Sequence, residues 1–183
     1  KNLLAAGWSV SAFDLSQAAL DDLTSAGAHG AKSAAEACES CDVVISMLPA
    51  GKHVKSVMMR SDGLFATLPA DTLVLDASTI DAADARELHE AALENSIAFM
   101  DTPVSGGVAA AQAGTLSFMC GGKAEAFARA VTVLEAMGNR EKIFHAGGGG
   151  ADGADAGDGG ESSRPHEHLQ LIDIQARCCV SVQ

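Results

Sequence analysis

Three groups of residues in this sequence carry side chains or backbone groups suited to binding a polar ligand. The first is Asp14, which directly follows the apolar segment Trp8–Phe13. In dinucleotide-binding folds a carboxylate at the end of such a strand accepts hydrogen bonds from the adenosine ribose, and its charge repels the 2′-phosphate of NADP. An Asp in a turn or at a helix N-cap is the structural alternative, and Asp14 alone favours neither reading.

A glycine-rich turn is the expected companion of such an Asp. The GxGxxG turn of these folds lies roughly 20 residues before the acidic residue, and that position falls before Lys1. We therefore expect the chain to begin inside the helix that follows the turn, so that the first strand and the phosphate-binding turn are missing.

Two further loops follow strongly apolar strands. Leu48 and Pro49 end the segment Val43–Leu48, and Thr79 closes the loop Asp76–Thr79 after the next strand. Open α/β sheets bind ligands beyond the carboxyl ends of their strands, so these residues are candidates for lining a cofactor. Taken singly, each loop is also an ordinary exit from a strand.

The most specific group is Ser105-Gly106-Gly107, at the end of the run Asp101–Gly107. Two glycines after a serine let backbone N–H groups approach an anion closely, which suits a substrate carboxylate. A turn with a purely structural role needs only one glycine. We therefore predict that these three residues bind the substrate.

The elements that would position these groups alternate between apolar runs and helical segments, which is typical of an α/β fold with a parallel sheet. Strands are expected at Trp8–Phe13, Gly27–Gly30, Val43–Leu48, Leu73–Leu75, Ile97–Met100, Thr115–Cys120 and Lys142–Phe144. Helices are expected at Asn2–Ala6, Ser16–Ser25, Ser33–Cys41, Lys52–Met59, Asp81–Glu94 and Ala124–Met137. Leu88 and Leu93 are assigned to the buried face of the helix Asp81–Glu94.

The pattern predicts a doubly wound, parallel-sheet domain of the Rossmann type over residues 1–147, without its first strand. In the sheet order 3-2-1-4-5-6 the missing strand is the central one, between Trp8–Phe13 and Val43–Leu48. Both neighbours would then have unpaired backbone edges. Folded domains are stable by only about 5–15 kcal/mol, so we expect this chain to be poorly stable.

Residues 148–183 form a second region with a different composition. Most of it is rich in Gly and Asp without apolar periodicity, which predicts a disordered tail. Asp152, Asp155 and Asp158 recur beside glycines, but calcium-binding solenoids need several stacked repeats and this chain has one irregular copy. The apolar segment Leu169–Gln183 has no obvious pairing partner in the sequence.

Composition argues against several classes of partner. The formal net charge of −12 repels nucleic-acid phosphates, and no run rich in Lys and Arg offsets it. The longest apolar stretch is far shorter than the roughly 20 residues that span a bilayer. The 5 cysteines are irregularly spaced, which suits a reducing compartment. The Cys38-x-x-Cys41 pair ends a helical segment and has no second pair beside it, so neither a redox motif nor a metal site is expected.

Five motifs in order, NLLAAG…FD, SMLPAGKHV, DASTID, DTPVSGG and AGTLSFMCGG, resemble those of the β-hydroxyacid dehydrogenase family. Within it, SMLPAGKHV resembles the 3-hydroxyisobutyrate dehydrogenases, and the similarity extends from Lys1 to about Gly147. The resemblance implies NAD-dependent oxidation of 3-hydroxyisobutyrate to methylmalonate semialdehyde in valine catabolism, in the bacterial cytoplasm or the mitochondrial matrix. It implies that Asp14 holds the adenosine ribose, Leu48 and Pro49 line the cofactor, Thr79 lies near the nicotinamide, and Ser105, Gly106 and Gly107 bind the substrate.

The sequence also departs from this family. The family's general acid/base is a lysine on a long helix after the last strand, whereas no lysine occurs here after Lys142. The family's helical C-terminal domain, which closes the site and forms the homo-oligomer, is not recognisable after Gly147. We therefore expect no catalytic residue in this chain and no activity from it alone. A sibling enzyme such as tartronate semialdehyde reductase, a non-catalytic nucleotide-binding fragment and a calcium-binding module remain alternatives.

Overall fold

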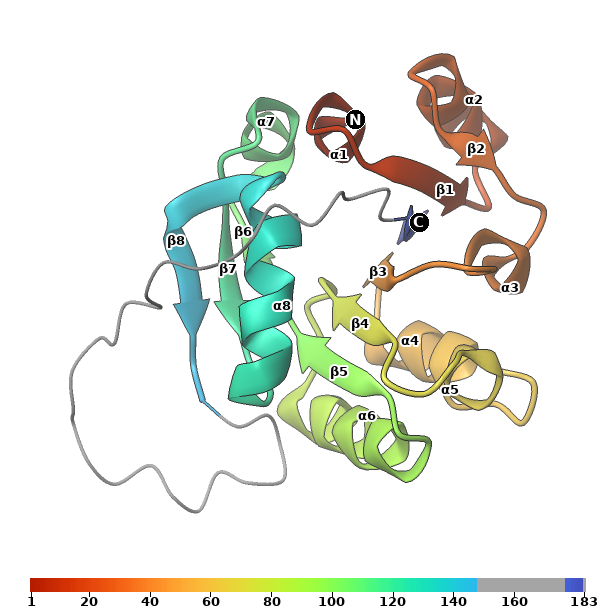
Figure 1. The fold of residues 1–183 in the computed structure, drawn as a ribbon, viewed down its shortest axis with the longest axis vertical. Coiled ribbons are helices and arrows are strands. Elements are labelled where there is room, and N and C mark those ends of the chain that lie inside the picture. The colour runs from red at the N-terminus through yellow and green to blue at the C-terminus, as the bar shows by residue number, and fades with distance from the viewer. Residues whose placement is uncertain (148–176, 183) are drawn as a thin grey trace.

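The computed structural model describes residues 1–147 and the backbone of residues 177–182. Its main element is a parallel sheet of six strands in the order β2-β1-β9-β3-β4-β5 (Figure 1). The strands are β1 (Ser9–Phe13), β2 (His29–Gly30), β3 (Val43–Met47), β4 (Leu73–Asp76), β5 (Ala98–Asp101) and β9 (Arg177–Val182). The predicted α/β fold with a parallel sheet is confirmed.

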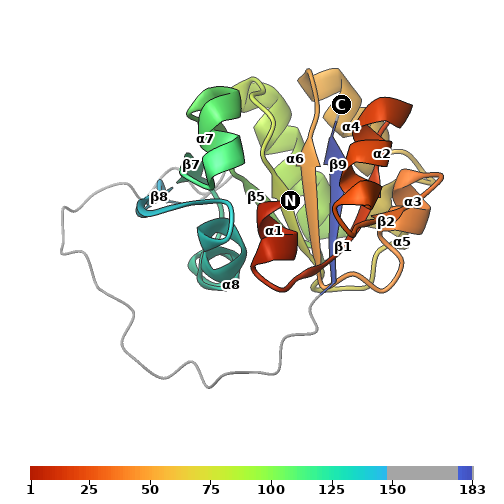
Figure 2. The same cartoon turned by 90° about the horizontal axis from the view of Figure 1, so that it is seen from above.

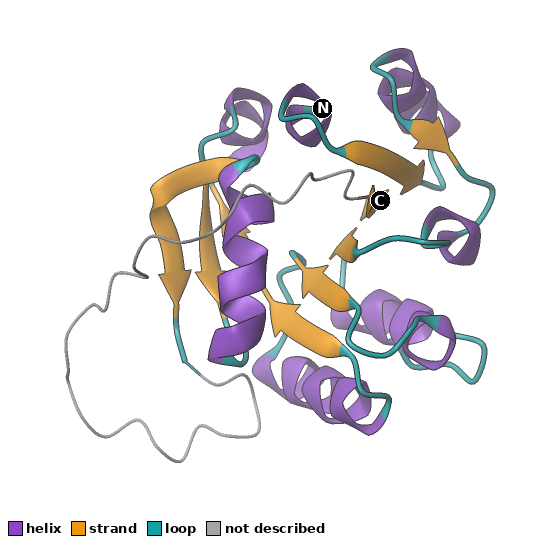
Figure 3. Ribbon diagram, in the orientation of Figure 1, coloured by secondary structure: helices purple, strands orange, loops and turns teal. Residues whose placement is uncertain are grey.

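Helices lie on both faces of this sheet (Figure 3). They are α1 (Asn2–Ala5), α2 (Gln17–Ser25), α3 (Ala34–Ala37), α4 (Gly51–Met58), α5 (Leu64–Thr67), α6 (Ala82–Glu94) and α8 (Ala124–Glu135). A further helix, α7 (Gly107–Ala113), contacts β7 (Leu116–Cys120) instead. The buried residues of α3 to α6 belong to one hydrophobic cluster, and those of α1 and α8 belong to another. The two sets of helices therefore cover opposite faces, as in a doubly wound sheet.

Successive side chains of the central strands alternate between the two clusters. Val44 and Val74 pack in the first cluster, whereas the next residues along each strand, Ile45 and Leu75, pack in the second. The pleat of a strand dictates this alternation. Because both faces are covered, a central strand needs apolar residues at nearly every position, which is why β3 and β4 are recognisable in the sequence as unbroken apolar runs.

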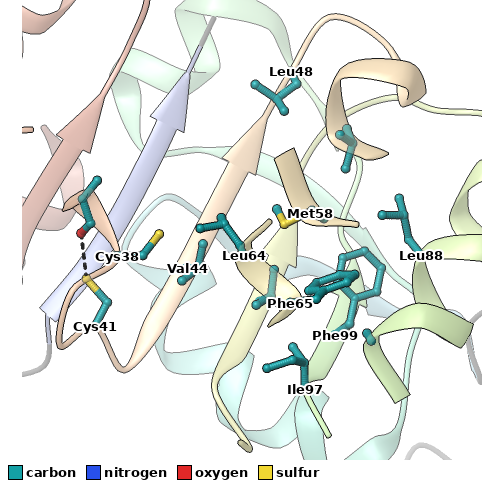
Figure 4. Packing of buried hydrophobic residues seen from close by; sticks show 14 of the residues in the cluster. Cys38, Cys41, Val44, Leu48, Met58, Leu64, Phe65, Leu88, Ile97 and Phe99 are labelled. Carbon is teal, nitrogen blue, oxygen red and sulfur yellow. Dashed lines mark hydrogen bonds between the residues drawn. The ribbon is translucent and has the colours of Figure 1, made fainter. Parts of the chain in front are cut away.

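The first cluster joins α3, α4, α5 and α6 to the sheet (Figure 4). Phe65 and Phe99 meet edge to face, with ring centroids 5.6 Å apart and an interplanar angle of 80°, a favourable aromatic geometry. Cys38 and Cys41 are buried in the same cluster, and the Cys41 thiol donates to the Ala37 carbonyl over 3.1 Å. This pair therefore contributes to packing at the end of α3.

A second sheet of three strands lies beside the main one, in the order β6 (Val104–Ser105), β7 (Leu116–Cys120), β8 (Gly138–His145). β6 is antiparallel to β7, and β7 is parallel to β8. A bridge between Asp101 and Gly121 joins the end of β5 to this region. Helix α7 connects β6 to β7, and Figure 2 shows it towards the same end of the molecule as the carboxyl end of β9.

The position of β9 corrects the expectation that β1 and β3 have unpaired edges. β9 lies between them and is parallel to both, with Val180 registered against Ala12 on one side and Ile45 on the other. The central position, for which no strand was found before α1, is thus filled from the far end of the chain. The expectation of a disordered tail is wrong for residues 177–182, whereas residues 148–176, with the Asp152, Asp155 and Asp158 repeat, lie outside the described residues.

Several smaller expectations also need correction. Leu88 is fully buried as predicted, but Leu93 is 63% exposed because it lies on the outer side of α6. Strand β8 is longer than the predicted Lys142–Phe144, and α5, β6 and α7 were not predicted. These short elements carry too few residues for an apolar period to be visible in the sequence.

The start of α4 is fixed by a close approach of α6. A Cβ atom on Gly51 would overlap the carboxylate of Asp84, so any larger residue here would displace the Asp84 side chain. The same carboxylate accepts a hydrogen bond from the Lys55 ammonium over 2.6 Å. The contact fixes the loop between β3 and α4, which contains Leu48 and Pro49, against the neighbouring helix.

The two leucines of α6 provide a matched test of this packing. Leu88→Ala should lower the free energy of unfolding by about 2–5 kcal/mol, the range for removing a fully buried leucine side chain. Leu93→Ala should change it by less than about 0.5 kcal/mol, because that side chain is exposed. Urea unfolding followed by circular dichroism measures both variants. Equal effects would contradict the orientation of α6.

Candidate functional site

The carboxyl ends of the parallel strands meet at one edge of the main sheet, here called the carboxyl edge. In sheet order, the residues that leave it are Asp14 after β1, Leu48 after β3, Ser78 after β4 and Thr102 after β5. β9 ends at the same edge, between Asp14 and Leu48. Ligands of open α/β sheets bind outside such an edge, at the point where the strand order reverses. The topology therefore brings the predicted cofactor residues to one side of the molecule.

Asp14 is 8% exposed and directly follows β1. Its Oδ1 atom accepts a hydrogen bond from the Ser16 amide over 2.7 Å, and the Ser16 hydroxyl in turn accepts from the Ala19 amide at the start of α2. The carboxylate thus has the turn role that the sequence left open. Its role towards a ribose stays a prediction.

A polar network is buried immediately beneath the carboxyl edge. The hydroxyls of Ser46 on β3 and Ser78 after β4 both donate to Asp76 Oδ1, over 2.7 and 2.6 Å. The Ser78 oxygen also accepts from the Leu48 amide over 2.8 Å. Since Asp76 is 0% exposed, this network ties the exits of two neighbouring strands together in the absence of water.

Burial raises the pKa of the Asp76 carboxyl above its ordinary value of 3.8. The hydrogen bonds from Ser78 and Ser46 oppose this shift, and the charge of Asp101, registered beside Asp76 on β5, adds to it. Asp76 Oδ2 and Thr102 Oγ1 are buried without a hydrogen-bond partner among the described residues. The edge therefore holds a carboxyl group whose charged form is only partly compensated.

The other predicted cofactor residues differ in accessibility. The Leu48 side chain is buried in the first cluster, where Figure 4 shows it above Val44, so only its backbone and neighbours can face a ligand. Pro49 and Thr79 are exposed, and Met47 is 44% exposed. Pro49 and Thr79 thus remain accessible candidates, whereas cofactor lining by Leu48 stays a prediction.

Ser105, Gly106 and Gly107 are exposed at the turn from β6 into α7. Gly106 has φ 129° and Gly107 has φ 65°, so both positions have the positive φ that favours glycine. A Cβ on Gly106 would also approach the Ala110 Cβ at 2.5 Å. The positive φ angles of this turn therefore account for both glycines, contrary to the expectation that a structural turn needs only one. Their binding of substrate stays a prediction.

A histidine and a carboxylate meet where β5 ends. His89 Nε2 on α6 lies 2.7 Å from Asp101 Oδ1, and the His89 ring packs edge to face on Phe99.

Burial, with a smaller contribution from Asp101, raises the pKa of the Cys120 thiol to about 12. Cys120 is therefore a protonated core residue at neutral pH and not a nucleophile.

Other features of the described chain do not add to the carboxyl edge. A cavity of about 460 Å³ opens beside the start of β5, between α6 and α8, and its lining includes Phe99 and Arg129. Within residues 1–147, no cluster of three or more His, Cys, Asp or Glu is placed to hold a metal ion. None of the helices that the structure describes is long and apolar enough to cross a membrane.

The buried network of Asp76 was not predicted as a unit. Its signal in the sequence was Ser46, a hydroxyl inside the otherwise apolar run Val43–Leu48, followed by Asp76 at the end of the next strand. Adjacent parallel strands bring such positions together when the register matches, and here Ser46 is registered against Asp76. Register is not readable from either segment alone.

Comparison with known proteins identifies the domain. Residues 1–148 match the family described as the NAD binding domain of 6-phosphogluconate dehydrogenase. The chain is 53% identical over 150 residues to the NAD-dependent L-serine dehydrogenase of Pseudomonas aeruginosa, which covers 82% of this chain and 50% of that protein. It is also 53% identical over 150 residues to the 3-hydroxyisobutyrate dehydrogenase of the same organism, with the same coverage.

A solved structure shows the same relationship. The 3-hydroxyisobutyrate dehydrogenase of Mycobacterium tuberculosis with L-serine superimposes with a TM-score of 0.76 at 42% identity, over 82% of this chain and 50% of that one. The chain thus spans about half the length of the curated relatives it matches. Strand β9 lies outside the residues 1–148 that match the family.

The buried carboxyl of Asp76 predicts a definite pH dependence of stability. A raised folded pKa favours the protonated form, so its contribution to stability is fully present below the unfolded value of 3.8 and is lost as pH rises through the folded value. The free energy of unfolding of the wild type should therefore fall relative to Asp76→Asn as pH rises from about 3.5 to 7. Exposed Asp62→Asn serves as the control, because the pKa of Asp62 is lowered. A free energy of unfolding that rose in the wild type relative to Asp76→Asn over this pH range would contradict the assignment.

Proposed function

The chain belongs to the family described as the NAD binding domain of 6-phosphogluconate dehydrogenase, and from its similarity to 3-hydroxyisobutyrate dehydrogenases we propose that it is the NAD-binding half of an enzyme that oxidises 3-hydroxyisobutyrate to methylmalonate semialdehyde. The observation that carries the proposal is the carboxyl edge, where Asp14, Pro49 and Thr79 leave adjacent parts of one parallel sheet. Dinucleotides bind along such an edge, at the reversal of strand order. Here the order reverses between β9 and β3.

The residues at this edge fit the two ends of NAD. A carboxylate at the end of β1 suits the hydroxyls of the adenosine ribose, and its charge opposes the additional phosphate of NADP. Pro49 and Thr79 are exposed further along the edge, where the nicotinamide half would lie. The hydrogen bond from the Leu48 amide to the Ser78 hydroxyl oxygen joins the loop after β3 to the loop after β4. The positions of Pro49 and Thr79 relative to each other are therefore preorganised for the cofactor.

The substrate would bind beside the nicotinamide. We assign its carboxylate to the Ser105 hydroxyl and the backbone N–H groups of Gly106 and Gly107, all exposed at the turn into α7. NAD, when bound, accepts the hydride from the carbon that bears the hydroxyl. The role of this chain's residues is to orient the two molecules so that this carbon faces the ring.

The relatives support a class of substrate, the short 3-hydroxy acids, more directly than they support one compound. One relative is an L-serine dehydrogenase, another at the same identity is a 3-hydroxyisobutyrate dehydrogenase, and a solved neighbour contains L-serine. Both compounds are short acids with a hydroxyl on the third carbon. The second candidate for this chain is therefore another 3-hydroxyacid dehydrogenase, acting on L-serine or tartronate semialdehyde, and a non-catalytic nucleotide-binding role is the third.

Binding of the two dinucleotides tests the cofactor site. NAD should bind the chain more tightly than NADP, and Asp14→Asn should narrow that ratio by about fivefold, because removing one charge near the 2′-phosphate relieves about 1 kcal/mol of repulsion. Asparagine keeps an oxygen that can accept from the Ser16 amide, so the turn into α2 is retained. Isothermal titration calorimetry measures all four affinities, with Asp62→Asn as the surface control. No saturable binding of NAD, or an unchanged ratio, would contradict the proposal.

Activity of the chain alone tests the catalytic assignment. No lysine follows Lys142, and losing a general acid/base typically lowers the rate by about 10²–10⁴-fold. We expect no detectable NADH when NAD is mixed with 3-hydroxyisobutyrate, with L-serine, or with the hydroxy acid that tartronate semialdehyde reduction produces. The assay follows absorbance and uses protein purified free of host enzyme. Turnover would show that another residue of this chain moves the hydroxyl proton.

A further inference from the structure

Strand β9 occupies a slot between β1 and β3, here called the central slot. Its register runs from Ser9 beside Arg177 to Phe13 beside Ser181 on one side, and from Val43 beside Cys178 to Met47 beside Val182 on the other. The segment therefore pairs with β1 over Arg177–Ser181 and with β3 over Cys178–Val182, so its four middle residues have partners on both sides. It lies outside the residues that match the family, so the fit follows from this chain's own sequence.

The walls of the central slot are backbone groups whose partner strand, among the described residues, is β9. β1 pairs with β2 only at Ser11 and Ala12, on its far side, and β3 pairs with β4 on its far side. The edges of β1 and β3 that face each other are paired through β9. A buried N–H or C=O without a partner costs about 1–3 kcal/mol, so a strand in this slot satisfies a row of otherwise costly groups.

The slot is also covered by packed residues. Val43 to Ser46 on β3 are buried on both faces of the sheet, and Val10 and Ala12 on β1 are buried on one face. Helix α3 contacts both β1 and β9 from one face. Direct pairing of β1 with β3 would need a shift of about 4.8 Å, one strand spacing, against helices that are packed on both strands.

These walls define the chemistry of an occupant. Val43 and Ile45 face the second hydrophobic cluster, and Val44 faces the first. A strand between covered faces needs small or β-branched apolar residues at successive positions, no charge within the run and no proline. The segment Arg177–Val182 has the sequence Arg-Cys-Cys-Val-Ser-Val, which meets these requirements after its first residue.

We propose that the central slot is a binding site for an extended apolar peptide in parallel orientation, filled in cis by residues 177–182 and open to the same segment supplied in trans. This is strand addition of the kind that main-chain hydrogen bonds drive at open sheet edges, with two edges in place of one. It concerns the backbone of β1 and β3 alone and holds whether or not the carboxyl edge binds a dinucleotide.

The tether sets the competition between the two copies. A strand that belongs to the same chain has an effective concentration of about a millimolar, so a free peptide competes poorly with it. Disabling the tethered copy removes that competition and leaves the slot available. Peptide binding should therefore be weak for the wild-type chain and stronger for a variant whose own strand cannot pair.

Val180→Pro is the variant that disables the tethered strand. Val180 is registered against both Ala12 and Ile45, and proline there removes an N–H that a strand paired on both sides donates to a neighbour. Val180→Ala, which keeps the N–H, is the matched control. The probe is a fluorescently labelled peptide of residues 177–183 under reducing conditions, and its anisotropy reports binding to each full-length chain.

The Val180→Pro chain should bind the peptide at least about tenfold more tightly than the wild type or Val180→Ala. A peptide carrying proline at the position of Val180 should bind none of them. Equal peptide binding by all three chains, or none by a folded Val180→Pro chain, would overturn the proposal. If Val180→Pro does not fold alone, adding the unlabelled peptide should restore its circular dichroism signal, and failure to restore it would also overturn the proposal.

Discussion

The pairing of backbone groups on the facing edges of β1 and β3 is the constraint on which the rest of this structure depends. β3 is buried from Val43 to Ser46 and β1 is buried at Val10 and Ala12, so N–H and C=O groups along these edges need partners within the protein. β9 supplies their partners over five registered positions on each side. With this strand in place, the sheet runs continuously from β2 to β5, and helices on both faces share one continuous support.

The carboxyl edge follows from that continuity. Asp14 follows the strand on one side of β9, and Leu48 follows the strand on the other, so β9 sets the spacing between the two strand ends. The Ser46, Asp76 and Ser78 network then fixes the neighbouring exits. The sheet order therefore creates the surface proposed for a dinucleotide. Asp14 and the loops after β3 and β4 supply the groups that would contact it.

Much of this arrangement was visible in the sequence because the strands are buried on both faces. Val43–Met47, apart from Ser46, and Leu73–Leu75 have the apolar character of central parallel strands, and the motifs at their ends identified the family. β9 was not predicted, because its partners lie more than a hundred residues away and nothing local in Arg177–Val182 specifies a parallel neighbour. Leu93 was misassigned because both leucines of α6 fit an apolar stripe, and only the packed neighbours show which one is buried.

The central claim is that residues 177–182 complete the sheet, and hydrogen exchange tests it most directly. The full-length chain should be compared with one that ends at Ala176, residue by residue over β1 and β3. The account predicts strong protection of the Val44 and Ile45 amides in the full-length chain and its loss in the shortened one. Equal protection of these amides in both chains would contradict it, because β1 and β3 would then be stable without β9 between them.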